Sequence, residues 1–287
     1  MTKLGHHIKD KGNLIMIRQV LHLQGMAWAI AIRTIIFPIT SLLRRTDRHL
    51  IWRLWEVYFG AQRLGVYPEV LLSNLIDNST SVQLLDIPAK PYNVSVTELL
   101  ALAALTSQLR AKNVFEFGTA DGRTTLNLAA NIHPSGQVHT INLPLEQATQ
   151  SSEGFSVGFC FKERPENTRI KQLWGDTKTF DFSPYYNSCQ IVFIDADHSE
   201  EAVWKDSQTA LKLVEQKLGI IIWHDALCFG VQKALPRLIS KGNLPIHLIS
   251  GTNLAVLLFA NGETMMPEEW IKHIHKPSEH QEMYSTT

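Results

Sequence analysis

The chain has 287 residues, which is long enough for one large α/β domain and a smaller appendage but gives no reason to expect three domains. Its 27 acidic side chains balance its 27 basic ones, so the net charge excludes a global field that would recruit nucleic acid. The 3 cysteines are too few and too scattered for a disulfide framework. We therefore expect no nucleic-acid partner and a reducing, cytoplasmic setting.

The first 93 residues are expected to form an N-terminal helical appendage and a linker. Within them, residues 24–43 (QGMAWAIAIRTIIFPITSLL) are apolar apart from Arg33, and Pro38 interrupts them. Because a central arginine is costly inside a bilayer, this stretch fits a membrane-spanning helix poorly. Peripheral membrane association and a homodimer contact stay open, and a buried or dimer-forming helix is the favoured interpretation.

An alternation of helical and strand patterns begins after the linker. Ser95 and Glu98 have the spacing of a capping box and predict a helix that runs through Leu109. Beyond it, apolar β-branched runs alternate with segments of helical period, which is typical of parallel strands joined by helical crossovers. The expected strands are 113–117, 137–141, 190–194, 219–223, 245–249 and 253–259, and the expected helices include 124–131 and 200–218. The connection around Gly251 is too short for a crossover, so one of the last two strands must pair antiparallel.

Residues 114–125 (VFEFGTADGRTT) form the sharpest motif: a strand carrying Glu116, a turn containing Gly118 and Gly122, and a helix. Glycines let a backbone approach a ligand closely, and the start of a helix offers unpaired amide groups. The spacing differs from the GxGxxG of dinucleotide sites, and no Gly-Lys-Ser/Thr follows as in a phosphate loop. A carboxylate at Glu116 instead suits a cationic ligand group, such as the ammonium of a methionine moiety.

Two later strands are expected to deliver polar side chains at the same edge of the sheet. Residues 191–198 (IVFIDADH) end in Asp195, Asp197 and His198, and residues 219–225 (GIIIWHD) end in His224 and Asp225. In open α/β sheets this carboxyl edge is where ligands bind. Oxygen and imidazole groups from adjacent strands predict a divalent-metal site, and its oxygen-rich character favours Mg²⁺ or Mn²⁺. The alternative is that Asp195 and Asp225 cap the helices that follow.

The first motif resembles that of class I S-adenosylmethionine-dependent methyltransferases, which have this acidic-x-Gly-x-x-x-Gly form. The resemblance spans about residues 94–260 and implies a Rossmann-like α/β fold with a seven-stranded, mostly parallel sheet containing one antiparallel strand. It places this domain at residues 94–262, followed by a C-terminal tail at 263–287. S-adenosylmethionine is the implied cofactor, and the implied binding residues are Glu116, Gly118, Thr119, Gly122, Asn142, Asp176 and Asp195.

Two of these positions carry particular meaning. Asn142 stands where the family has an acidic residue that accepts hydrogen bonds from the ribose hydroxyls, and its side-chain carbonyl can still accept one. Asp176, after Gly175, resembles the third motif of the family and is placed to meet the adenine amino group. A Gly-Asp pair is otherwise a common turn.

The acidic and imidazole cluster resembles the metal-dependent O-methyltransferases of catechols, phenylpropanoids and antibiotic sugars. The resemblance implies Asp195, His224 and Asp225 as metal ligands. His224 replaces a residue that usually offers oxygen, which weakens a magnesium assignment or makes the metal softer. His198 follows Asp195 at the spacing of the base in the sugar-modifying members, and Asp197 is a second candidate base. The implied reaction is methylation of a hydroxyl oxygen on a small molecule or glycan.

Two other functions compete with this one. Asp195-Ala196-Asp197 also matches the DxD of nucleotide-sugar glycosyltransferases, but that interpretation leaves the motif around Gly118 unexplained. A non-catalytic scaffold that keeps the fold is the other alternative, with Asn142 and His224 as marks of lost activity. Failure to bind the cofactor would favour the scaffold.

Overall fold

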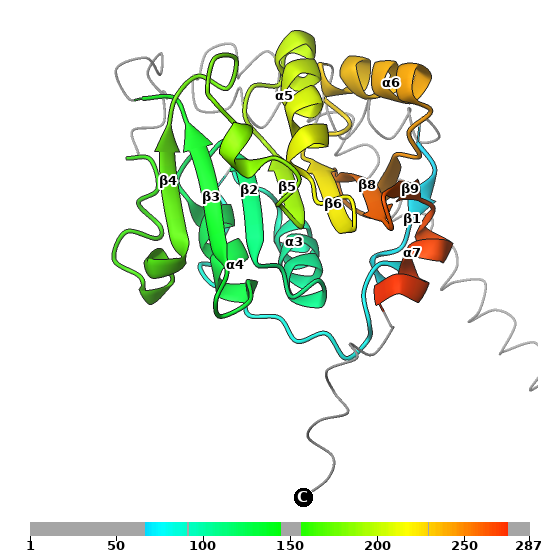
Figure 1. Ribbon diagram of the computed structural model, residues 1–287. Helices are drawn as coiled ribbons and strands as arrows, with labels where there is room; N and C mark the ends of the chain where they lie inside the picture. Colours follow the sequence, from blue (N-terminus) through cyan, green and yellow to red (C-terminus); the bar gives the residue numbers. More distant parts are fainter. Residues whose placement is uncertain (1–66, 91, 145–155, 229, 275–287) are drawn as a thin grey trace, which may run out of the picture. The chain divides into compact units, whose positions relative to one another are not determined.

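The computed structural model describes residues 67–90, 92–144, 156–228 and 230–274 (Figure 1). The chain divides into two compact units, Met1–Ala61 and Gln62–Thr287, and all described residues belong to the second. Residues 24–43 lie outside the described part, so the membrane and dimer contacts expected there stay predictions. Among the described residues, no helix is both long and apolar enough to cross a membrane.

A nine-stranded sheet forms the centre of the second unit, in the order β1-β7-β8-β6-β5-β2-β3-β4, with β9 also paired to β8. Every pairing is parallel except those that β8 makes with β6, β7 and β9. The predicted Rossmann-like sheet with one antiparallel strand is therefore confirmed, and two short strands, β1 and β9, extend it from seven strands to nine. The strands are β1 (Glu69–Val70), β2 (Asn113–Phe117), β3 (Gln137–Asn142), β4 (Ile170–Trp174), β5 (Ile191–Ile194), β6 (Leu218–Trp223), β7 (His247–Ile249), β8 (Ala255–Ala260) and β9 (Glu263–Met265).

Helices cover both faces of this sheet, and alternate residues of each central strand contribute to two separate cores. In β6, Ile221 and Trp223 pack with residues of α5 and α6, whereas Ile220 and Ile222 pack with residues of α3 and α4. Burial on both faces explains why the central strands are continuously apolar. The helices are α3 (Val96–Gln108), α4 (Arg123–Asn131), α5 (Glu200–Leu213), α6 (Val231–Gly242) and α7 (Pro267–Ile274), with 3-10 turns η1 (Leu72–Asn74), η2 (Pro165–Arg169) and η3 (Ser183–Tyr185).

Several elements differ from the sequence expectation. Helix α5 ends at Leu213 rather than at 218, because Val214 turns to extended backbone and bridges Cys189 beside the sheet. The edge strand β4 has no counterpart among the predicted strands. The stretch 263–287, expected as a tail, contains β9 and α7, and α7 buries Trp270, whose indole N–H donates to the Leu75 carbonyl at 3.4 Å.

Candidate metal and cofactor site

The neighbouring strands β5 and β6 end side by side and carry the polar cluster expected from the sequence. Ile194 pairs in register with Trp223, and the His224 amide donates to the Ile194 carbonyl at 3.0 Å. The Asp195 amide in turn donates to the Phe117 carbonyl of β2 at 2.9 Å. The parallel register thus fixes the first polar residue after each strand at one edge of the sheet.

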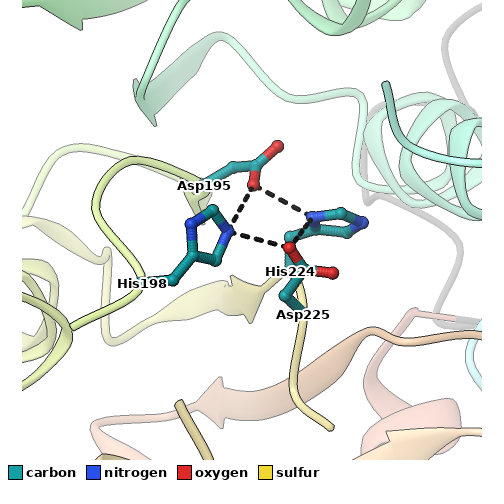
Figure 2. A group of neighbouring side chains, drawn as sticks. All are labelled: Asp195, His198, His224 and Asp225. Atoms are coloured by element: carbon teal, nitrogen blue, oxygen red, sulfur yellow. Dashed lines mark hydrogen bonds and ion pairs between the residues drawn. The ribbon is translucent and has the colours of Figure 1, made fainter. Parts of the chain in front are cut away.

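Four side chains converge at this edge: Asp195, His198, His224 and Asp225 (Figure 2). The Asp195 Oδ1 atom lies 2.9 Å from His224 Nδ1 and 3.6 Å from His198 Nε2. The Asp225 Oδ2 atom lies 2.8 Å from His198 Nε2 and 3.3 Å from His224 Nδ1. One ligand atom from each residue lies within 4.8 Å of all the others, so these four, called the Asp-His cluster below, can hold a metal ion.

Charge pairing dominates the electrostatics of the Asp-His cluster. The carboxylates of Asp195 and Asp225 raise the pKa of His198 to about 10. Burial by itself would lower the pKa of His224. Its acidic neighbours, Asp195 foremost, outweigh this effect and hold that pKa well above its ordinary value. Burial likewise opposes ionisation of Asp195 and Asp225, yet the imidazoles hold the pKa of both carboxyl groups below the usual range. Without a bound cation, this charge pairing favours the protonated form of both imidazoles.

The backbone at Asp225 has an uncommon conformation, with φ of 51° in the left-handed region. Such a conformation in a residue other than glycine is sparsely populated and persists where the surroundings hold it. Here Asn253 donates its side-chain amide to Asp225 Oδ1 at 3.1 Å and accepts the Leu227 amide at 2.9 Å. The turn that carries Asp225 is thus held by a residue just before β8.

The glycine turn between β2 and α4 lies directly against this cluster. Gly118 and Gly122 have φ of 93° and 85°, and Ala120 between them has φ of 45°. A Cβ atom on Gly118 would come within 2.2 Å of the Asp195 carbonyl oxygen, and one on Gly122 would come within 2.6 Å of the Phe161 ring. Internal packing therefore requires glycine at both positions. This is a second reason for the two glycines, beside the close approach of a ligand expected from the sequence.

The polar residues beneath this turn form a buried network. Glu116 is fully buried, its Oε2 accepts the Thr125 hydroxyl, and burial raises the pKa of its carboxyl group to about 8. Thr119 turns its hydroxyl inward, 2.8 Å from that of Thr140 and 3.0 Å from Gln172 Nε2. In the described part of the chain, Glu116 Oε1 and Gln172 Oε1 are buried without a hydrogen-bond partner.

The other expected cofactor ligands lie at the ends of β3 and β4. Asn142 accepts the Thr119 amide through Oδ1 at 3.3 Å, so its carbonyl already ties β3 to the glycine turn. Asp176 accepts the Lys178 amide at 2.9 Å within a turn. Trp174, which pairs in register with Asn142, is 47% exposed and leaves a flat apolar ring beside these residues.

The structure separates the two candidate bases. His198 belongs to the Asp-His cluster, whereas Asp197 is exposed and accepts the Ser199 amide at 2.8 Å, just before α5. Asp195 and Asp197 therefore do not converge as a DxD pair. Glu98 was not expected at the site from the sequence, yet its Oε2 lies 3.5 Å from His224 Nε2. Its only signal in the sequence was the capping box, which explains the residue without reference to a site.

Comparisons with known proteins give a family match and a set of similar solved structures. Residues 115–226 match the model of a family described as a methyltransferase domain. A comparison with curated proteins finds no match. Among solved structures, the chain is similar to cofactor-bound Rv0187 from MTB, at 19% identity and TM-score 0.45 over 62% of this chain and 85% of that one.

Two further solved structures are similar in the same way. One is an O-methyltransferase from Bacillus cereus in complex with SAH, at 20% identity and TM-score 0.43 over 61% of this chain and 84% of that one. The other is the O-methyltransferase TomG from Streptomyces achromogenes in complex with SAM, at 18% identity and TM-score 0.45 over 60% of this chain and 83% of that one.

The sheet order and the glycine turn after β2 have the form expected from the resemblance to class I methyltransferases, and residues 115–226 match a methyltransferase domain. The matched residues include the motif with Glu116 and Gly118 and both strand ends of the Asp-His cluster. The match thus agrees with the class that the first motif predicted.

Proposed function

We propose that this protein methylates a hydroxyl oxygen of a small molecule or sugar, with a divalent metal ion assisting. The convergence of the Asp-His cluster beside the glycine turn carries this proposal, because it sets proton-handling groups against the expected cofactor loop. A small molecule or glycan is the acceptor class, and no nucleic-acid contact is expected, since the chain has equal numbers of acidic and basic side chains.

The residues around the glycine turn fit S-adenosylmethionine. That molecule, when bound, supplies a methyl group on a positively charged sulfur. The buried Glu116 Oε1 has no partner within the described residues, and an ammonium group nearby would lower the pKa of this carboxyl group from about 8. Asn142 and Asp176 would hold the ribose and adenine ends, beside the exposed face of Trp174.

The Asp-His cluster also fits a divalent ion. Ligands bound at metal distances of about 2.1 Å in a tetrahedral arrangement lie about 3.4 Å apart. The separations from His224 Nδ1 to Asp195 Oδ1 and to Asp225 Oδ2, 2.9 and 3.3 Å, are close to that size. The ion, when bound, would lower the pKa of a nearby hydroxyl group. Asp195, His224 and Asp225 are the proposed ligands, as the sequence indicated.

His198 is the first candidate for the base that takes the acceptor's hydroxyl proton. Its pKa of about 10 keeps the imidazole protonated at neutral pH. Neutralising the charge of Asp195 and Asp225 with another cation would lower that pKa and free a ring nitrogen to accept a proton. As the proton leaves, the acceptor oxygen bonds to the methyl carbon and the carbon–sulfur bond breaks, leaving S-adenosylhomocysteine. Asp197 is the second candidate base.

The test combines cofactor binding with acceptor choice. We expect calorimetry to show micromolar binding of S-adenosylhomocysteine that Trp174→Ala weakens about tenfold. That loss is the ~1–1.5 kcal/mol of one aromatic stacking contact. Tyr186→Ala is the matched control, because Tyr186 is 46% exposed and lies after η3 rather than at the end of β4. Variants of Gly118 are unsuitable, since any side chain there also displaces Asp195.

Turnover is then measured as S-adenosylhomocysteine release with a catechol, a hexoside, an aryl amine and an alkyl thiol as acceptors. We expect release with a hydroxyl acceptor only, and loss of that release in the presence of a chelator. Transfer to the amine or the thiol would overturn the oxygen assignment. Absence of cofactor binding under every condition would overturn the proposed activity and favour the non-catalytic scaffold.

A further inference from the structure

Glu98 is a buried carboxylate from a distant part of the chain that reaches the Asp-His cluster. It lies in the first turn of α3, and its side chain is 8% exposed. Its two oxygens are held from two directions: Oε2 accepts the Ser95 amide at 2.7 Å, and Oε1 accepts the Asn253 amide at 2.8 Å. A carboxylate fixed in this way is a rigid partner for a neighbouring ring.

That neighbouring ring is His224. Its Nε2 atom lies 3.5 Å from Glu98 Oε2, whereas its Nδ1 atom faces Asp195 Oδ1 at 2.9 Å. Because Glu98 offers only acceptors, the arrangement keeps a proton on Nε2 and leaves Nδ1 as the atom that binds within the cluster. A carboxylate behind a histidine is the usual way in which a metal-binding ring is oriented.

Asn253 joins the same arrangement from before β8. Its backbone amide binds Glu98, and its side-chain amide donates to Asp225 Oδ1, which leaves Asp225 Oδ2 facing His198 Nε2 at 2.8 Å. Glu98 and Asn253 therefore support one imidazole ligand and one carboxylate ligand through a shared hydrogen bond.

The proposed ligands contribute one imidazole nitrogen, from His224, and two carboxylate oxygens, and the His198 imidazole lies within 3.6 Å of both carboxylates. Imidazole suits transition ions such as Zn²⁺, Fe²⁺ and Co²⁺, whereas Mg²⁺ demands octahedral oxygen ligands and keeps several waters. We propose that Glu98 and Asn253 are positioning residues that shape the Asp-His cluster into a centre for a divalent transition-metal ion in preference to Mg²⁺. The inference rests on the metal ion of the proposed function, and of the Mg²⁺ or Mn²⁺ expected from the sequence it sets aside only Mg²⁺.

The test is titration of the full-length protein with Co²⁺ and, in parallel, with Mg²⁺. Calorimetry gives the affinities, and visible absorption reports imidazole bound to Co²⁺. We expect Co²⁺ to bind at least tenfold more tightly than Mg²⁺. Glu98→Gln replaces one of the two side-chain oxygens of Glu98 with an NH₂ group, which then faces a hydrogen-bond donor. We therefore expect Co²⁺ affinity to fall by about 10–100-fold and the visible spectrum of bound Co²⁺ to change.

Ser95→Ala is the matched control. It removes the hydroxyl that caps α3, but the contacts of Glu98 with the Ser95 backbone, Asn253 and His224 all remain. We expect a lower melting temperature with Co²⁺ affinity unchanged within about twofold. Equal Co²⁺ affinities for Glu98→Gln and Ser95→Ala, or Mg²⁺ binding as tight as that of Co²⁺, would overturn the inference.

Titration of the same samples with S-adenosylhomocysteine separates this inference from the proposed function. Cofactor binding without a preference for Co²⁺ overturns the metal inference alone. Tight Co²⁺ binding that depends on Glu98, in a protein that binds no S-adenosylhomocysteine, supports the metal centre and overturns the methyltransferase proposal.

Discussion

Aspartates between the end of β5 and the turn after β6 have opposite electrostatic settings. Asp195 and Asp225 face imidazoles, which hold the pKa of each carboxyl group below its ordinary value despite burial. Asp206, on α5, is 1% exposed, and its Oδ2 has no hydrogen-bond partner in the described part of the chain. Burial, opposed by a hydrogen bond with Thr177 and assisted by repulsion from Asp197 and Asp176, raises the pKa of Asp206 to about 6.

The setting of Asp206 predicts a pH-dependent cost to stability. Because the folded-state pKa exceeds the unfolded one, the folded state holds the proton more tightly, and stability falls as pH rises from about 4 to 6. A shift of about two units corresponds to roughly 2–3 kcal/mol above pH 6. We expect Asp206→Asn to stabilise the protein by up to that amount at pH 8 and to have little effect at pH 4, as measured by urea unfolding.

Asp181→Asn provides a control of opposite sign. The pKa of the Asp181 carboxyl group is lowered by the Ser183 amide, whose hydrogen bond to Oδ1 is 3.0 Å long. Its replacement should therefore lose rather than gain stability as pH rises above the unfolded pKa. If Asp206→Asn were no more stable than the parent at pH 8, the buried charge of Asp206 would not destabilise the fold.

Individual elements show which structural features the sequence could reveal. The capping box at Ser95 and the start of α5 at Glu200 depend on local chemistry, and both were predicted where they occur. The end of α5 was not, because the helical period continues past Leu213 while pairing within the sheet determines the conformation of Val214. Strand β4 escaped prediction because it is an edge strand whose Lys171 and Gln172 interrupt the apolar pattern.

The residues of the site also divide into those that the sequence could predict and those that it could not. The polar residues of the Asp-His cluster could be predicted to meet, because parallel strands bring the residues after their carboxyl ends to one edge of the sheet. Glu98 and Asn253 could not, since their contacts depend on how α3 and the residues before β8 pack against β6. Packing between elements distant in the chain leaves no pattern in a single sequence.

The N-terminal end of α6 fixes the position of the loop that carries His198. A Cβ atom on Gly230 would come within 1.9 Å of the His198 carbonyl oxygen, which is backbone and cannot rotate away. We expect Gly230→Ala to displace this loop and to destabilise the fold by about 1–3 kcal/mol. Co²⁺ affinity should fall with it, because His198 Nε2 leaves its place beside Asp225. Urea unfolding and Co²⁺ calorimetry measure the two effects.

Gly242→Ala is the matched substitution at the other end of the same helix. The nearest atom to a Cβ there is Leu244 Cγ at 2.9 Å, which belongs to a side chain that can move. This variant should keep its Co²⁺ affinity and be about as stable as the parent, because alanine favours helix more than glycine by about 1 kcal/mol. Equal behaviour of the two variants would show that Gly230 does not position His198.

At the scale of the whole folded unit, one face of α4 holds the segment that leads into α3. Arg123, Asn127 and Asn131 lie four residues apart along this face and bind the backbone of residues 83–94. Arg123 is 2% exposed and donates to three carbonyl oxygens, those of Asp86 at 2.7 Å, Ile87 at 2.7 Å and Val94 at 3.0 Å. Helix α4, which follows the glycine turn, is thus hydrogen-bonded to the segment that precedes α3.

We expect Arg123→Met to release this segment while the sheet stays folded. Three carbonyl groups lose a charged donor, which should lower the free energy of unfolding by about 3 kcal/mol. Hydrogen exchange at the Leu85 and Gln83 amides should accelerate more than exchange in β2. Arg123→Lys should lose nearly as much stability, because a single ammonium group cannot reach three separate carbonyls. The control is Arg164→Met at an exposed position, which should change stability by less than about 0.5 kcal/mol. Unchanged exchange at Leu85 in Arg123→Met would mean that the asparagines alone hold the segment, and the cofactor turn would then be independent of the chain that precedes α3.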